Sequence, residues 1–286
     1  RGAGCGRGAG RRSDRRGPRL SALAANGRKA RALFVHAFAS MTEYRAEIVT
    51  WMISGSLPLV MMAMWIGLAA DGPVGGYDAA DFAAYFLVVF LVRQLTVVWV
   101  IWELDREIRL GELSPKLLRP IDPLWGHVAD NLAEKAVRLP LVLVPVTAGL
   151  WWAGAQLPLT IESLGGFVLL VVGAWVIKFF QQYATGLLTF WTDQTVGLER
   201  VWFSVSMVLS GALAPLDLFP EAVRAVLPYT PFPYLVDVPV QALLGRLAGP
   251  ELLQAFVVQG AWGLAFVVAS RLAWRHGIRR YGAVGA

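Results

Sequence analysis

FAAYFLVVFLVRQLTVVWVIW, residues 82–102, is an apolar run that is interrupted near its middle by Arg93 and Gln94. A helix of about 20 residues crosses a hydrocarbon core roughly 30 Å thick, so this run has the length of a transmembrane helix. The whole chain agrees, because 56% of its 286 residues are hydrophobic and only 16% are charged, whereas soluble domains carry about 25% charged residues. The sequence therefore predicts a helical membrane protein.

Six stretches have the apolar character of membrane spans, namely 48–70, 82–102, 136–155, 164–190, 201–216 and 252–274. All but one reach the length that a spanning helix needs. The exception, 201–216, crosses only if it recruits 196–200 or ends in a re-entrant turn. We expect an all-α, polytopic fold with six transmembrane helices in a membrane domain over 48–281.

Basic residues are distributed unevenly between the loops that these spans define. With the N-terminus placed in the cytoplasm, 22 lysines and arginines lie on the cytoplasmic side, and only Arg224 and Arg246 lie on the other. Cytoplasmic loops of membrane proteins carry such an excess of basic residues. The bias predicts that both termini are cytoplasmic.

Two segments of different character precede the first span. Residues 1–27 are rich in arginine and glycine and have almost nothing to bury, which predicts a disordered cytoplasmic tail that anchors the topology. Binding of this tail to RNA or to anionic headgroups is the alternative. Residues 28–47 carry apolar side chains every three or four positions, which predicts an amphipathic helix in the cytoplasmic interface. An extension of the first span is the alternative there.

The segment 215–250, before the last span, contains seven prolines yet stays largely apolar and aromatic. Non-helical backbone at membrane depth survives only where protein or a water-filled cavity surrounds it. We therefore expect short re-entrant helices on the extracytoplasmic side, around 219–227 and 234–244.

Two basic residues lie inside predicted spans, each with amide side chains nearby. Arg93 is followed by Gln94, and Lys178 has Gln181 and Gln182 one turn on. An ionisable residue at the bilayer centre costs about 2.5–3.5 kcal/mol on insertion scales, so it usually faces protein or water. These residues are candidates for the polar lining of a pathway or for a contact with a second subunit. Snorkelling, or a satisfied pair inside the bundle, is the alternative.

The sequence lacks the motifs of catalysis. A P-loop needs a glycine before its lysine, and none of the four lysines follows a glycine. H-E-x-x-H, G-x-S-x-G and paired-cysteine motifs are also missing, so we expect no catalytic site and no metal site. Glu103, Asp105 and Glu107 do not all share a helical face, and arginines lie beside them, which favours a solvated ion-pair network.

The cytoplasmic loop 103–135 contains IRLGELSPKLLRPIDPL, residues 108–124. Its leucines fall at helical spacing, and the later prolines end the pattern. We expect one side of a short helix to be formed by Leu110, Leu113, Leu117 and Leu118. Such a helix is typical of a docking element that fits a groove on a partner protein. Because this chain has no nucleotide site, we expect that the partner binds ATP and supplies the energy. A loop lying on lipid headgroups is the alternative.

The motif I-R-x-G-x-L-x-x-x-L-L-R-P-x-x-P, read from Ile108 to Pro123, resembles the intracellular loop of type 2 ABC exporter permeases. It is most similar to the subgroup described as ABC-2 family transporter proteins. The stretch YRAEIVTWM, residues 44–52, and the proline-rich segment are similar to that family as well. The resemblance extends from Ala30 to Tyr281.

This resemblance implies a six-span permease with a cytoplasmic interfacial helix, a coupling helix between the second and third spans, and re-entrant helices before the last. Two permease subunits, identical or paralogous, would pair with two ABC ATPase subunits. The ATPase would bind ATP and Mg, and this chain would hold no cofactor. By position, the ATPase-coupling residues are Arg109, Gly111, Glu112, Leu113, Lys116, Leu117, Leu118, Arg119 and Pro120.

The sequence and the resemblance together predict the membrane subunit of an ATP-driven exporter in the bacterial cytoplasmic (inner) membrane. Its expected substrate is amphiphilic or lipid-like, its surroundings are membrane lipid, and no nucleic-acid partner is expected. A membrane-embedded enzyme acting on lipid or peptide is one alternative, which activity of the purified chain without ATP would favour. An ion-coupled carrier or passive channel using Arg93 and Lys178 is another, which an inverted repeat would favour.

Overall fold

The computed structural model describes residues 31, 34, 35, 38, 50, 53, 55–155 and 157–281. The predicted tail over 1–27 lies outside these residues, and the predicted interfacial helix over 28–47 lies largely outside them. Both stay predictions.

The described part of the chain is helical, with turns and one isolated bridge between Val74 and Tyr77. Its longer helices are α3 (Leu57–Leu68), α4 (Ala79–Leu95), α5 (Val100–Arg109), α7 (Pro123–Trp152), α8 (Ile161–Leu187), α9 (Thr195–Leu209) and α12 (Pro250–Tyr281). Its short elements are α6 (Leu113–Leu117), α10 (Glu221–Val226), α11 (Asp237–Leu243), η1 (Leu188–Phe190), η2 (Leu216–Leu218), η3 (Leu227–Tyr229) and η4 (Pro233–Leu235). The predicted all-α class is confirmed.

By length and composition, three helical stretches among the described residues are suited to cross a membrane: Ala79–Arg109, Ile161–Phe190 and Pro250–Tyr281. They coincide with the predicted second, fourth and sixth spans. α3 is apolar but has 12 residues, and α9 has 15 residues. α7 is 30 residues long, and its N-terminal half carries several charged side chains. The first, third and fifth spans therefore stay predictions.

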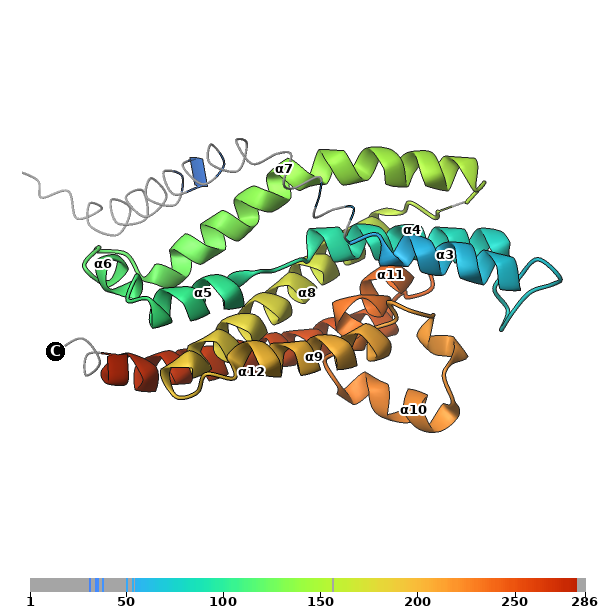
Figure 1. Ribbon diagram of the computed structural model, residues 1–286. Helices are drawn as coiled ribbons and strands as arrows, with labels where there is room; N and C mark the ends of the chain where they lie inside the picture. The colour runs from blue at the N-terminus through green and yellow to red at the C-terminus, as the bar shows by residue number, and fades with distance from the viewer. Residues whose placement is uncertain are drawn as a thin grey trace, which may run out of the picture.

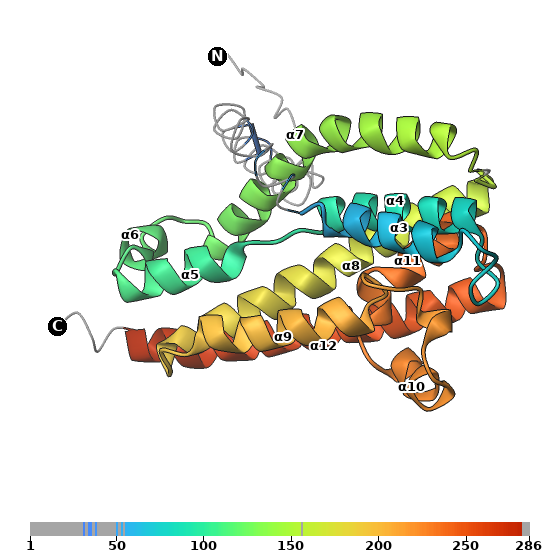
Figure 2. The same ribbon diagram turned by 45° about the vertical axis from the view of Figure 1, so that its right-hand side comes forward.

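α4 is the central helix of the bundle. Its capping box at Asp78 and Asp81 fixes where the helix begins. From Phe82 to Val92 all of its side chains are buried, as expected for a helix that is hydrophobic all round. It packs against α3, α7 and α11, and Figures 1 and 2 show α3 and α4 lying between α7 and α8. The core is therefore built around the predicted second span.

The predicted second span is interrupted, because α4 ends at Leu95 and α5 begins at Val100. The hydroxyl of Thr96 donates to the carbonyl of Val92, 2.8 Å away, and such a side-chain bond competes with the helical ladder. Lys135 Nζ, on α7, donates to the carbonyl of Val97 over 2.6 Å. This bond satisfies a backbone acceptor that the interruption leaves out of the helix.

The segment between α9 and α12 contains the short helices that the sequence predicts. α10 covers part of 219–227, and η4 with α11 covers most of 234–244. α11 is largely buried and packs against α4 and α8. Whether these helices re-enter a membrane stays a prediction.

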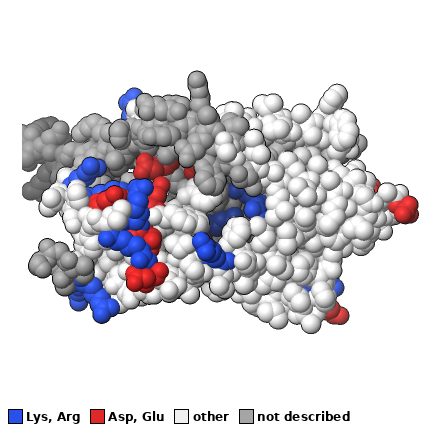
Figure 3. Space-filling view, viewed as in Figure 1, with Lys and Arg blue, Asp and Glu red and all other residues white. Residues whose placement is uncertain are grey.

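The two ends of the molecule differ in their elements and in their charge. α6, the turn between α8 and α9, and the C-terminal end of α12 lie together at one end, and α11 lies toward the other (Figures 1 and 2). Figure 3 shows charged side chains of both signs gathered at the first end, whereas most of the remaining surface in this view is uncharged. The charged end is the one that the sequence predicts to be cytoplasmic. The orientation itself stays a prediction.

Candidate functional site

The predicted coupling segment forms the corner between α5 and α7. Gly111 has φ 75°, a conformation that glycine adopts without strain, and the chain turns there into α6. Leu113 is fully buried, whereas Leu118 is 88% exposed and Leu117 is 37% exposed. Leu110 caps the C-terminus of α5 rather than belonging to α6. The predicted ridge of four leucines is therefore wrong: one leucine anchors the corner, and the others point away from the core.

Residues 117–120 form an exposed tip after this anchor. Leu117, Leu118, Arg119 and Pro120 are all exposed, and Arg119 forms no ion pair with any described residue. An exposed apolar and basic tip on a short helix is suited to insertion into a groove of another protein. We call residues 117–120 the tip.

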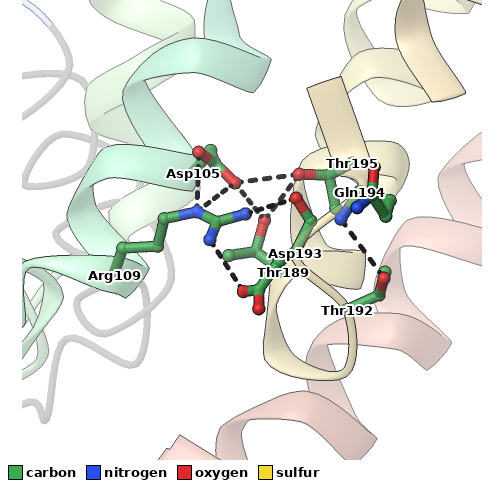
Figure 4. A network of polar contacts seen from close by, with 7 residues as sticks. All are labelled: Asp105, Arg109, Thr189, Thr192, Asp193, Gln194 and Thr195. Atoms are coloured by element: carbon green, nitrogen blue, oxygen red, sulfur yellow. Dashed lines mark hydrogen bonds and ion pairs between the residues drawn. The ribbon is translucent and has the colours of Figure 1, made fainter. Parts of the chain in front are cut away.

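Arg109 lies on the inner side of this corner. Its Nε is 2.9 Å from Asp105 Oδ1, its Nη1 is 2.7 Å from Asp193 Oδ1, and its Nη2 donates to the Asp193 carbonyl. Asp105 also accepts hydrogen bonds of 2.8 Å from the hydroxyls of Thr189 and Thr195. Figure 4 shows Asp105 between Arg109 and these threonines of the α8–α9 turn. Arg109 and Asp105 therefore join α5 to the turn between α8 and α9 and to the start of α9.

A second set of contacts joins α5, α6 and α7. Glu107 is buried, and its Oε1 accepts from Lys116 Nζ over 2.5 Å. His127, also buried, places Nε2 3.4 Å from Glu107 and Nδ1 3.2 Å from Glu103. Burial disfavours a charged imidazole, but the two carboxylates outweigh it and raise the pKa of His127 to about 9. The predicted solvated network around Glu103, Asp105 and Glu107 is thus partly wrong, because Glu107 is inside.

Further contacts hold the corner against α12. Asp122, which caps the start of α7, pairs with Arg271 at 2.8 Å. The hydroxyls of Ser114 and Tyr281 are 3.0 Å apart. Glu112 and Arg106 form an exposed pair at 3.3 Å. The corner is consequently tied to the ends of α5, α7, α8, α9 and α12, and a displacement of the tip would be transmitted to all of them.

A cleft lies beside the interruption between α4 and α5. It encloses about 520 Å³, and residues of the interruption, of α8 and of α9 line it. Among the predicted intramembrane residues, it is lined by Arg93, Lys178, Gln181 and Gln182. Figure 3 shows Lys or Arg side chains inside a hollow near the middle of this face. The structure therefore brings together four of the five polar residues that the sequence singled out.

Gln94, the fifth, lies elsewhere. Its Oε1 accepts from Arg138 Nη1 over 2.7 Å, on the side of α4 that packs against α7. Arg138 is buried and also pairs with Glu134 one turn earlier. Sequence reasoning missed this pair, although acidic and basic residues at i and i+4 are a recognisable helical signal.

Two further cleft residues were also missed by sequence reasoning. Glu199 and Arg200 line the cleft from the start of α9. Glu199 is buried, and its Oε2 accepts from Gln181 Nε2 over 2.9 Å. Both residues directly precede the apolar run 201–216 that predicts the fifth span, so no pattern identified them as site residues. Their position shows that the cleft extends toward the charged end of the molecule.

In the part of the chain that the structure describes, no group of three or more His, Cys, Asp or Glu side chains is arranged to hold a metal ion. The buried and inward-facing polar residues of the corner are paired with one another, and Arg93, Lys178, Gln181 and Gln182 line an open cleft. The arrangement suits mechanical coupling and ligand binding.

The comparisons with known proteins agree with this arrangement. The family model for the ABC-2 family transporter protein matches residues 56–285, which include α3 through α12 and thus both the corner and the cleft. Neither the curated proteins nor the solved structures give a match. Members of this family are membrane subunits that associate with an ABC ATPase and are not themselves catalytic. This chain therefore belongs to the ABC-2 transporter family, as a multi-pass membrane protein and the permease component of an ABC transporter.

Proposed function

We propose that the permease is the membrane subunit of an ATP-driven exporter that moves an amphiphilic or lipid-like molecule. The ATPase would bind ATP and Mg, and two ATPase subunits would act on two permease subunits. The assembly would lie in the bacterial cytoplasmic (inner) membrane with both termini of this chain in the cytoplasm, in keeping with the distribution of basic residues.

The observation that carries this proposal is the difference in exposure between the tip and the buried leucine that anchors the corner. Leu118 is 88% exposed, whereas Leu113, five residues earlier, is fully buried. A side chain as apolar as leucine gains free energy when a partner covers it, by about 25 cal/mol for each Å² of apolar surface removed from water. The tip therefore has the properties of a coupling helix that docks into an ATPase groove.

The contacts of the corner give the docked tip a route to the cleft. Arg109 and Asp105 join α5 to the α8–α9 turn and the start of α9. α5 leads to the interruption at 96–99, all of which lines the cleft. Two rigid helices joined by a non-helical segment can change their angle at that segment. In the proposed cycle, closure of the ATPase dimer moves α5 as a lever and reshapes the cleft.

The experiment uses the permease with its ATPase, purified together in mild detergent and reconstituted in nanodiscs. Leu118→Asp should lower recovery of the ATPase with the permease and abolish transport-coupled ATP hydrolysis, because a carboxylate in the groove remains desolvated without a partner. Leu159→Asp is the matched control, since Leu159 is 67% exposed in the turn before α8. Recovery of the permease alone from its native membrane, repeatedly and without an ATPase, would contradict the proposal.

A further inference from the structure

The cleft beside the α4–α5 interruption carries more basic than acidic side chains. Arg93, Lys178 and Arg200 line it, and Glu199 is the one acidic lining residue among those that the structure describes. Gln181 holds the Glu199 carboxylate by a hydrogen bond of 2.9 Å, and Glu199 forms no ion pair with a described residue. The lining thus has an excess of positive charge.

The two deeper basic side chains have only uncharged partners among the described residues. Lys178 Nζ donates to the Thr96 hydroxyl over 2.7 Å, and Arg93 Nη1 donates to the sulfur of Met207 over 2.9 Å. Both side chains are half-buried. A charge that leaves water without an opposite charge nearby costs free energy, so an anion in the cleft would be bound favourably by both.

Two further polar atoms of the lining have hydrogen-bonding capacity to spare. Gln182 Oε1 and Ser206 Oγ are buried, and neither finds a hydrogen-bond partner among the described residues. Buried polar atoms are paired in most native structures, so each unpaired one calls for an explanation. A ligand that offers both oxygen acceptors and hydroxyl donors would satisfy both atoms.

The rest of the lining is apolar. Trp99 and Trp102 lie with ring centroids 5.2 Å apart, and both line the cleft together with Trp202, Phe203 and valines of the interruption. The Trp202 ring packs against the rings of Phe232 and Phe266. The wall can therefore cover a hydrocarbon chain while the basic residues contact a polar head.

We propose that this cleft binds a phosphate-bearing amphiphile, with its headgroup between Arg93 and Lys178 and its chain against the tryptophans. The guanidinium and ammonium groups match the oxygens of a phosphate, and the volume of about 520 Å³ is within the usual range of ligand pockets. The inference deepens the proposed export function, because it assigns the class of molecule that the permease moves.

The binding test uses the permease–ATPase complex in digitonin, a detergent without phosphate, with dodecyl phosphate as the probe. Dodecyl maltoside tests the apolar contribution alone, and inorganic phosphate tests the charge alone. Dodecyl phosphate should bind at least tenfold more tightly than either, and it should stimulate ATP hydrolysis. Equal binding of dodecyl phosphate and dodecyl maltoside would overturn the proposal, and so would binding of dodecyl phosphate without stimulation.

The variants Arg93→Gln and Lys178→Gln should each weaken dodecyl phosphate binding by about tenfold or more, since each removes one charge from the headgroup site. Arg275→Gln is the matched control, because Arg275 is exposed on α12 and does not line the cleft. Arg93→Lys keeps the charge and should retain more binding than Arg93→Gln. Unchanged binding in both glutamine variants would overturn the inference.

Different measurements test the substrate class of the cleft and the proposed export function. Arg93 and Lys178 do not belong to the tip, so their glutamine variants should still recover the ATPase. Arg275→Gln, outside both the cleft and the tip, should leave both ATPase recovery and basal ATP hydrolysis unchanged. Loss of ATPase recovery in wild-type protein would contradict export itself. Loss of lipid-phosphate selectivity with normal ATPase recovery would contradict only the assignment of the substrate class.

Discussion

Asp105→Asn tests how the corner is held together. Asp105 Oδ1 accepts from Thr189 and Thr195 at 2.8 Å each and from Arg109 Nε at 2.9 Å. Hydrogen bonds to a charged group are about twice as strong as neutral ones, so neutralising the carboxylate should cost about 1 kcal/mol for each threonine. The partly exposed pair with Arg109 should add less than about 1 kcal/mol. The expected total is about 2–3 kcal/mol.

A loss of this size is measurable in thermal unfolding of the purified complex. For a chain of this size the melting temperature should fall by about 4–12 °C. Coupled ATP hydrolysis should also fall, because α5 would no longer move together with the α8–α9 turn. The lower melting temperature and the reduced ATP hydrolysis would both result from the loss of the Asp105 contacts.

Asp193→Asn is the matched control for Asp105→Asn. The Asp193 side chain is 86% exposed and, within the part of the chain that the structure describes, pairs with Arg109 alone. Its backbone carbonyl should still accept from Arg109 Nη2 after the substitution. It should cost less than about 1 kcal/mol and leave coupling intact. Equal losses in the two variants, or a stable and fully coupled Asp105→Asn protein, would refute the reasoning.

Three further predictions concern the same region. Because the pKa of His127 is raised to about 9, its imidazolium should contribute stability that is fully present below about pH 6.5 and is lost as the pH rises through 9. The melting temperature of wild type should therefore fall more steeply between pH 7 and pH 10 than that of His127→Gln. An equally steep fall in the two proteins would contradict this. Leu113→Ala should cost about 2–5 kcal/mol in denaturant unfolding, whereas Leu118→Ala at an exposed site should cost less than about 0.5 kcal/mol. Lys135→Met should cost about 1–3 kcal/mol, since it leaves the Val97 carbonyl without its donor; an unchanged melting temperature would show that this bond does not support the interruption.

The all-helical class and the position of the corner could be predicted from the sequence, because each follows from local periodicity. The grouping of Lys178 with Gln181 and Gln182 was also predictable, since residues three and four apart share a helical face. Arg93 and Gln94 are neighbours in sequence, however, and adjacent residues of a helix point in directions about 100° apart. One consequently lines the cleft while the other meets Arg138.

The interruption between α4 and α5 could not be predicted from the apolar run alone. Residues 82–102 contain neither glycine nor proline, so the strongest local signals for the end of a helix are missing from this run. The interruption depends on partners from other helices, namely Lys135 at the Val97 carbonyl and Lys178 at the Thr96 hydroxyl. The predicted leucine ridge was wrong because Gly111, with its positive φ, separates α5 from α6. Leu110 and Leu113 therefore do not lie on one continuous helix.

The central claim is that an ATPase pushes on this permease through the tip, and crosslinking at Leu118 tests it most directly. A photoreactive amino acid at position 118, in the permease expressed with its native partners, should form an adduct with the nucleotide-binding subunit on illumination. The same group at position 159 should form none. An adduct with lipid alone at position 118, in membranes that contain the ATPase, would contradict the claim.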